Sequence, residues 1–146
     1  MTIKNHISYL LNINKLKKIK LIVSDIDGVM TDGRIIFDDN GVESKFFNTL
    51  DGMGIVMALK SDIKIAIISG GKANCVRERF DKFKAHNFED LILGEDYKMP
   101  SILTLIKKYS IIIKITSIRG NLFHEKILFT NIGACIICCP DSVRKC

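Results

Sequence analysis

The feature that most constrains this chain is a short apolar run followed at once by two closely spaced aspartates. The stretch is Leu21-Ile22-Val23-Ser24-Asp25-Ile26-Asp27-Gly28. Such a run is typical of a buried strand in a parallel sheet, and α/β proteins bind ligands at the carboxyl ends of such strands. Two carboxylates this close repel each other unless a cation lies between them, which favours a hard cation such as magnesium. A strand-end turn without a metal would also use Asp and Gly, so this first motif leaves both interpretations open.

Apolar segments of strand and helix type alternate along the rest of the chain. We expect strands at 19–24, 63–68, 88–93, 111–118 and 134–139, and helices at 51–59, 73–84, 99–109 and 122–130. This alternation is typical of an α/β protein, a three-layer doubly wound parallel sheet with helices on both faces. A chain of 146 residues is long enough to bury a core, so we expect one domain over 1–146.

Two segments do not fit this alternation. Residues 1–18 carry a weak amphipathic pattern with several lysines, which predicts an N-terminal helix or a loose arm. Residues 34–47 contain two short strand-like stretches around an Asn40-Gly41 turn, a strong signal for a β-hairpin inserted after the first strand. Because an isolated hairpin is only marginally stable, we expect a partner surface for it.

Charge and hydropathy exclude some classes of protein. The net charge is +6, but residues 21–106 hold 14 acidic and 10 basic side chains, so the basic excess lies at the two ends. A nucleic-acid-binding protein would show a basic stripe with interleaved aromatic residues, and we expect no nucleic-acid partner. No apolar stretch reaches the length of a membrane span and no signal peptide is evident, which favours a cytoplasmic protein without a membrane partner.

Four of the five cysteines lie near the C-terminus, and their spacing raises the question of a zinc site. They are Cys135, Cys138, Cys139 and Cys146, with Cys75 apart from them. A structural zinc site needs more ligands nearby, and His124 is the only histidine close in sequence. Because Cys135 to Cys139 lie in an apolar run, buried strand thiols are the favoured interpretation.

Polar groups also follow the later strands. Ser69-Gly70-Gly71 offers a hydroxyl and main-chain N–H groups at a helix start, which suits a phosphate, although a simply capped helix would use the same residues. Lys98 precedes the next helix, where it can hold a phosphate oxygen, although a single lysine is usually solvated. The stretch 120–125, Gly-Asn-Leu-Phe-His-Glu, follows the fourth expected strand. We expect these groups to meet Asp25 and Asp27 in one crevice above the sheet.

The first motif extends to Asp25-Ile-Asp-Gly-Val-Met-Thr-Asp-Gly33, which resembles the first motif of the haloacid dehalogenase (HAD) phosphatase superfamily. The stretch Phe46-Phe-Asn-Thr-Leu-Asp-Gly-Met-Gly54 is similar to the small capless branch that contains 3-deoxy-D-manno-octulosonate 8-phosphate (KDO 8-phosphate) phosphatase and N-acylneuraminate 9-phosphate phosphatase. The resemblance covers roughly Leu21 to Pro140. It implies a HAD-like fold without a cap domain, a homotetramer whose hairpins pack together beside the active site, and a role in lipopolysaccharide biosynthesis.

The resemblance also implies a role for each matching residue. Asp25 would be the nucleophile that takes the phosphoryl group, and Asp27 would protonate the leaving sugar oxygen and then activate water. Ser69, Gly70 and Lys98 would bind the phosphoryl group. Asn48 and Asp51 would bind the substrate, a phosphorylated sugar acid. Magnesium would be held by Asp25, by the main-chain carbonyl of Asp27 and by Asn121, with Glu125 in support.

The chain departs from the family pattern in three places. The fourth motif of close relatives is Gly-Asp-Asp-x-x-Asp, whereas this chain has Gly120-Asn121-Leu122-x-x-Glu125, so a neutral amide replaces an anionic ligand. Gly71 stands where the octulosonate phosphatases often have arginine. The resemblance also implies a further strand and a Gly-rich tail that reaches into a neighbouring site, whereas this sequence ends at Cys146, soon after the fifth expected strand.

Three functions therefore stay open. One is a magnesium-dependent phosphomonoesterase for KDO 8-phosphate or N-acylneuraminate 9-phosphate. The second is a catalytically weakened or inactive oligomeric subunit. The third is a phosphoacceptor in which Asp25 stays phosphorylated, which the neighbouring acid Asp27 disfavours.

Overall fold

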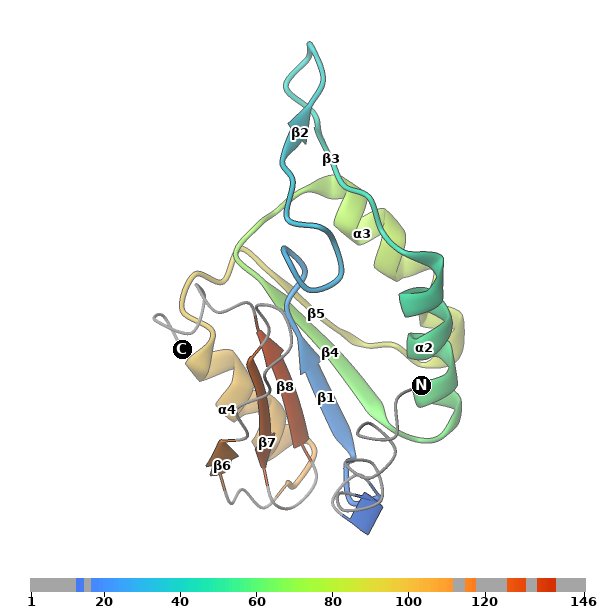
Figure 1. Cartoon of the computed structure of the whole chain (residues 1–146), viewed down its shortest axis with the longest axis vertical. Helices are drawn as coiled ribbons and strands as arrows, with labels where there is room; N and C mark the ends of the chain where they lie inside the picture. Colours follow the sequence, from blue (N-terminus) through green and yellow to red (C-terminus); the bar gives the residue numbers. More distant parts are fainter. Residues whose placement is uncertain (1–12, 15–16, 112–114, 118–125, 131–133, 139–146) are drawn as a thin grey trace, which may run out of the picture.

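The computed structural model describes residues 13–14, 17–111, 115–117, 126–130 and 134–138, and it contains two sheets (Figure 1). The elements in chain order are β1 Leu21–Ser24, β2 Ile36–Phe37, β3 Glu43–Ser44, α2 Thr49–Lys60, β4 Lys64–Ser69, α3 Asn74–Asp81, the 3₁₀ helix η1 Lys84–His86, β5 Asp90–Leu93, α4 Met99–Lys108, β6 Ile115–Ser117, β7 Lys126–Thr130 and β8 Ala134–Cys138. The larger sheet has the order β5-β4-β1-β8-β7-β6, and β2 and β3 form the smaller one.

The centre of the larger sheet is parallel, which confirms the predicted α/β fold. β1 pairs in parallel with β4 on one side and with β8 on the other, and β4 pairs in parallel with β5. Ser24, the last residue of β1, lies beside Ile67 of β4. The carboxyl ends of these strands therefore share one edge of the sheet, which is the edge where an α/β protein places its ligand.

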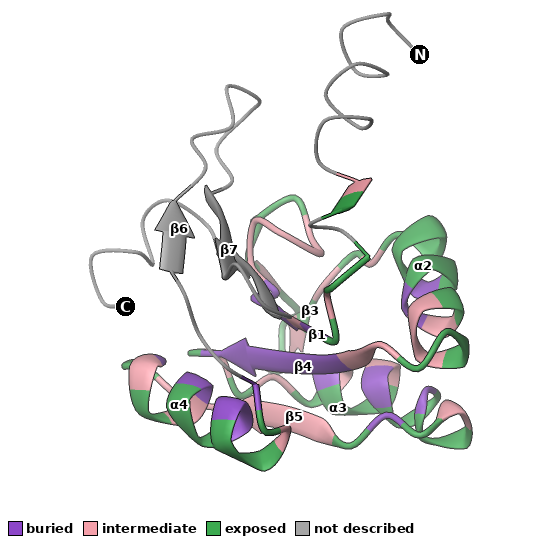
Figure 2. Ribbon diagram, turned by 90° about the horizontal axis from the view of Figure 1, so that it is seen from below, coloured by how far each residue is buried: buried purple, intermediate pink, exposed green. Residues whose placement is uncertain are grey.

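Helices cover both faces of this parallel part, and the core is split accordingly. Along β4, Ala66 and Ile68 belong to one cluster, whereas Ile65 and Ile67 belong to the other, as the two-residue period of a strand requires. The first cluster includes Ile102, Leu105 and Ile106 of α4, and the second includes Ile55 of α2 with Val76 and Phe80 of α3. Figure 2 shows β4 as a largely buried strand near these helices. Burial on both faces explains why the strands are continuous apolar runs.

The predicted helix at 122–130 is wrong, because residues 126–130 form strand β7. β7 is antiparallel to β8 and to β6, so the sheet is mixed rather than parallel throughout. Only residues 131–133 separate β7 from β8, and a parallel connection needs a crossover of a dozen or more residues. Ile127-Leu128-Phe129-Thr130 is rich in strand-forming residues, and periodicity alone does not distinguish a helix from a strand in so short an apolar run.

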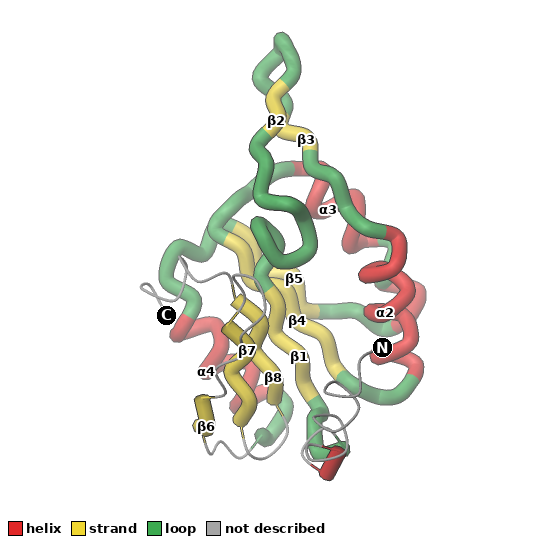
Figure 3. Tube along the Cα trace, viewed as in Figure 1, coloured by secondary structure: helices red, strands yellow, loops and turns green. Residues whose placement is uncertain are grey.

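Within segment 34–47, β2 and β3 pair antiparallel and project beyond the carboxyl ends of the central strands (Figure 3). Asp38 organises the turn, because its Oδ1 accepts hydrogen bonds from the main-chain N–H groups of Asn40 (3.0 Å) and Val42 (2.8 Å). Gly41 has φ +75°, a conformation that favours glycine.

Some predictions fall outside these residues. Most of the expected N-terminal helix or arm at 1–18 does, as do Cys139 and Cys146. Cys135 and Cys138 lie on β8 and Cys75 is a free thiol on α3. In the part of the chain that the structure describes, no helix meets the length and hydropathy that a membrane span requires.

Candidate active site

Asp25 directly follows β1 and is only 7% exposed. Each oxygen of its carboxylate accepts a hydrogen bond. The main-chain N–H of Ile26 donates to Asp25 Oδ1 at 2.7 Å, and the Lys98 ammonium donates to Oδ2 at 2.5 Å. The chain then turns sharply, since the Ile26 carbonyl accepts from the N–H groups of the three residues 29–31. Gly28 has φ +75° in this turn, which explains the glycine after the second aspartate.

Lys98 reaches Asp25 from the residue before α4, 73 positions further along the chain. It is 7% exposed, and a buried ammonium is tolerated only when it is paired. The packing of α4 against the sheet through Ile102 and Leu105 carries Lys98 to this edge. Lys98 and Asp25, two of the residues that we expected to meet above the sheet, are therefore in direct contact in the structure.

Ser69 ends β4 and is 2% exposed. Its hydroxyl accepts a hydrogen bond from the Gly71 N–H at 3.2 Å, and its carbonyl accepts from the N–H groups of Gly94 and Glu95 after β5. A Cβ atom built on Gly71 would lie 3.6 Å from Ser69 Oγ and 3.7 Å from Asp27 Oδ2. Ser69 and Asp27 thus approach one point from two neighbouring strands.

Asp27 is paired with a lysine that sequence analysis did not single out. Lys45 Nζ lies 2.6 Å from Asp27 Oδ1 and 2.6 Å from Glu43 Oε1. Burial on its own would lower the pKa of Lys45, but its hydrogen bonds with the Asp27 and Glu43 carboxylates outweigh burial and raise that pKa. The two-residue spacing of Glu43 and Lys45 was the available signal, because it places both on one side of an extended segment.

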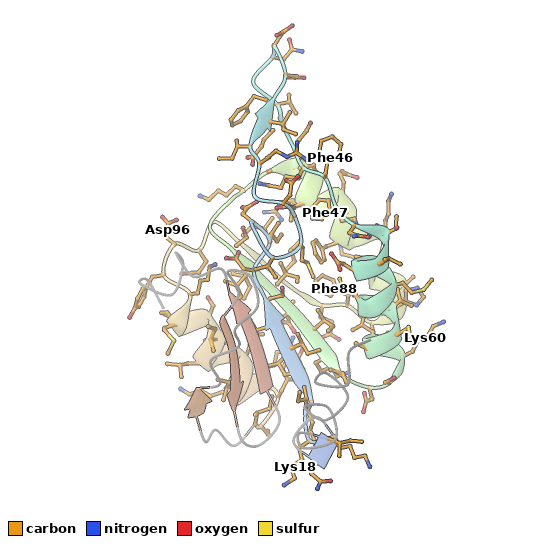
Figure 4. The ribbon with its side chains drawn as sticks, in the orientation of Figure 1. Lys18, Phe46, Phe47, Lys60, Phe88 and Asp96 are labelled. Carbon is orange, nitrogen blue, oxygen red and sulfur yellow. The ribbon has the colours of Figure 1, made fainter. Side chains whose placement is uncertain are left out.

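Asn48 and Asp51, the predicted substrate-binding residues, line one cavity of about 420 Å³. The other lining residues are Val29, Met30, Thr31, Asp32, Phe46 and Phe47. Asn48 also caps α2, because its Oδ1 accepts from the Leu50 N–H at 2.9 Å. Figure 4 shows Phe46 and Phe47 at the base of the hairpin. The volume is within the range of small-molecule sites, roughly 300–1,000 Å³.

The oxygen atoms that the described residues offer at this edge of the sheet suit a hard cation. Asp25 and Asp27 supply carboxylate oxygens, and no N–H or O–H group of the described residues donates to the main-chain carbonyl of Asp27. Oxygen donors of this kind are the ligands that magnesium takes in proteins. Within the same residues no group of three or more His, Cys, Asp or Glu side chains is arranged to hold a metal ion.

The predicted fourth-motif residues Asn121 and Glu125 lie outside the described residues. They follow β6, the edge strand of the larger sheet, which is separated from β1 by β8 and β7. The role of Asn121 as a ligand stays a prediction.

Comparisons with known proteins agree on one class. No family model matches the chain. A solved structure of a HAD superfamily (subfamily III A) hydrolase from Legionella pneumophila matches with TM-score 0.65 and 28% identity, over 75% of this chain and 58% of that one. The chain belongs to the haloacid dehalogenase superfamily.

Within that superfamily, the chain is similar to the KDO 8-phosphate phosphatases. It is 40% identical over 99 residues to the phosphatase KdsC of Escherichia coli (strain K12), covering 68% of this chain and 51% of that protein. The Moraxella catarrhalis KDO 8-phosphate phosphatase, solved in complex with magnesium ion, phosphate ion and KDO, matches with TM-score 0.61 and 36% identity. That match covers 68% of this chain and 56% of the other. The chain thus spans about half the length of the curated relatives it matches.

The buried ion pair predicts a stability effect. Lys98→Met leaves the Asp25 carboxylate buried without its cation, so we expect a loss of roughly 3–5 kcal/mol in the free energy of unfolding by urea. Lys64→Met is the matched control, because Lys64 pairs with an exposed aspartate and should cost less than about 1 kcal/mol.

The double variant Asp25→Asn/Lys98→Met should be more stable than Lys98→Met alone, because it removes the orphaned charge. Strictly additive losses in the two single variants would contradict the pairing.

Proposed function

We propose that this chain is a magnesium-dependent phosphomonoesterase acting on a phosphorylated acidic sugar of the KDO 8-phosphate kind. The observation that carries the proposal is the buried Asp25–Lys98 pair at the sheet edge where Ser69 and Asp27 converge. The similarity of the chain to KDO 8-phosphate phosphatases supports the class of substrate. N-acylneuraminate 9-phosphate is the alternative substrate. We further propose that it acts in the cytoplasm, in lipopolysaccharide biosynthesis.

In the first step, a carboxylate oxygen of Asp25 attacks phosphorus and the bond from phosphorus to the sugar oxygen breaks. Asp27 takes up a proton on Oδ2 before this step, while Oδ1 keeps its bond to Lys45, and gives that proton to the leaving oxygen. Lys98 offsets charge on the phosphoryl oxygens, while the Ser69 hydroxyl and the Gly70 N–H donate hydrogen bonds to them. Asp25 now carries the phosphoryl group as an acyl phosphate, and the free sugar leaves.

In the second step, the Asp27 carboxylate takes a proton from a water molecule whose oxygen attacks phosphorus. The bond from phosphorus to Asp25 breaks, inorganic phosphate leaves, and Asp25 returns to a carboxylate. A carboxylate nucleophile thus divides one difficult hydrolysis into two easier reactions. Asp27 ends protonated and ready for the next turnover.

Magnesium would be held by Asp25, by the main-chain carbonyl of Asp27 and by Asn121. When bound, it offsets negative charge on the phosphoryl oxygens. Asn121 presents a neutral amide oxygen where close relatives have a carboxylate, so we expect weaker metal binding than an aspartate would give.

The cavity at Asn48 and Asp51 would take the sugar part of the substrate. The Asn48 side-chain NH₂ remains as a donor, since its oxygen is used in capping α2. Asp51 offers acceptors for sugar hydroxyls, and Phe46 and Phe47 supply an apolar wall. Half of the eight lining residues are polar, which suits the hydroxyl groups of a sugar.

The direct test is phosphate release by the purified chain. We expect release from KDO 8-phosphate with magnesium, loss of release with a chelator, and a fall in kcat/KM of about 10³-fold or more in Asp25→Ala, because the nucleophile is removed. Asp81→Ala on α3 is the matched control, since this exposed aspartate pairs only with Lys84 among the described residues. No release from either sugar phosphate would contradict the proposal.

Asn121→Asp separates this function from the second candidate, an inactive oligomeric subunit, which the neutral residue at 121 favours. A large rise in activity would identify the natural chain as a weakened enzyme. A folded Asn121→Asp variant that still releases no phosphate would favour the inactive subunit.

We also propose that the chain forms a homotetramer through its hairpin. Ile35, Phe37 and Val42 are exposed on the hairpin, and Met53 and Met57 are exposed on α2. Apolar side chains grouped on an exposed surface mark an interaction site, and a two-stranded hairpin needs such a partner to be stable.

Sedimentation equilibrium tests this assembly. We expect the wild-type chain to sediment as a tetramer and Phe37→Lys to form smaller species, because a buried unpaired ammonium disrupts an apolar contact. Leu103→Lys, at an exposed position on α4, should leave the mass unchanged. A wild-type monomer at all concentrations would contradict the proposal.

A further inference from the structure

Lys45 is a nearly inaccessible lysine outside the set of predicted site residues. Its side chain is 2% exposed, less than the 8% of the Lys98 side chain. It lies between β3 and α2, at the point where the hairpin rejoins the body of the molecule. The only carboxylates paired with its ammonium in the described residues are those of Asp27 and Glu43, both at 2.6 Å.

The charge balance explains why a lysine is tolerated there. One ammonium faces two carboxylates, so its charge is more than matched, and the two hydrogen bonds keep its pKa above the ordinary value in spite of burial. Glu43 is 24% exposed at its side chain and pairs with no other described cation.

Asp27 has the opposite character, since its side chain is 44% exposed and lies in the turn after β1. A carboxylate on such a turn has no fixed direction unless a partner holds it. Lys45 donates a hydrogen bond to Oδ1. The other oxygen, Oδ2, lies 3.7 Å from the position of a Cβ atom built on Gly71, and Ser69 Oγ lies 3.6 Å from the same position. Lys45 therefore fixes which oxygen of Asp27 faces Ser69 and Gly71.

We propose that Lys45 is a positioning residue for the acid–base carboxylate of Asp27, and that Glu43 holds Lys45 in place. This inference rests on the proposed function. Lys45 acts only through Asp27, so its loss weakens proton transfer to the leaving oxygen and from water, and leaves substrate binding intact. The hairpin thereby contributes a residue to catalysis as well as a surface for association.

The test compares kcat and KM for KDO 8-phosphate in Lys45→Met, Lys45→Arg, Glu43→Gln and the control Lys64→Met. We expect Lys45→Met to lower kcat by about 10–100-fold with KM within about threefold, because well-placed general acid–base groups contribute factors of this order or more. Lys45→Arg should recover much of kcat, Glu43→Gln should lower it several-fold, and Lys64→Met should match the wild type.

First-turnover rates with p-nitrophenyl phosphate give a second readout. The p-nitrophenolate leaving group needs no proton, so Lys45→Met should slow the first turnover with this ester far less than with the sugar phosphate. A residue that only anchored the hairpin would slow both substrates equally.

The outcomes separate the two proposals. An inactive wild-type chain contradicts the proposed function itself. An active wild type together with an unaltered kcat in Lys45→Met, or with a loss that lies wholly in KM, overturns the role of Lys45 alone. If Lys45→Met does not fold, a wild-type kcat in Glu43→Gln overturns it, because Glu43 touches the site only through Lys45.

Discussion

The rest of the site depends on the buried ion pair between Asp25 and Lys98. Neither charge is stable at this edge of the sheet without the other, and the two residues come from the end of β1 and the start of α4. The pair therefore forms only when α4 is packed on its face of the sheet and β1 lies between β4 and β8. This contact joins two segments that lie 73 positions apart, and it places the Asp25 carboxylate beside the Lys98 ammonium. A carboxylate beside a fixed cation is the electrostatic arrangement that phosphoryl transfer requires.

A second pair, Asp27 with Lys45, links this edge to the hairpin. The hairpin projects from the sheet and bears exposed apolar side chains, so it is the part of the described structure that most needs a partner. Because Lys45 lies at its base, association of hairpins and the direction of the Asp27 carboxylate are connected through a few residues. The proposed association of hairpins and the proposed role of Asp27 are therefore linked by the direct contact between Lys45 and Asp27.

Sequence reasoning located the parallel strands and the helices up to Lys108, because long apolar patterns and strand-end polar residues carry that information. The prediction of a helix at 122–130 failed because a short apolar run suits either a helix or a strand. The three-residue connection to β8 makes residues 126–130 an antiparallel strand. Sequence reasoning also passed over Lys45, since a lone lysine is usually solvated and its contact with Asp27 spans 18 positions. The approach of Lys98 to Asp25 was expected because both residues lie at the same edge of the sheet, and the family resemblance added that Lys98 would bind the phosphoryl group. Asn121 and Glu125 remain predictions.

The central claim is that Asp25 carries the phosphoryl group during turnover. Slowing the second step with Asp27→Asn should let that species accumulate, because the water is no longer activated. Acid quenching of this variant with magnesium and p-nitrophenyl phosphate, whose leaving group needs no proton from residue 27, should be followed by peptide mass spectrometry. We expect one added phosphoryl group on Asp25 and none in Asp25→Asn/Asp27→Asn. Hydrolysis of the substrate by the wild-type chain with an unmodified Asp25, or with the label on another residue, would contradict the account.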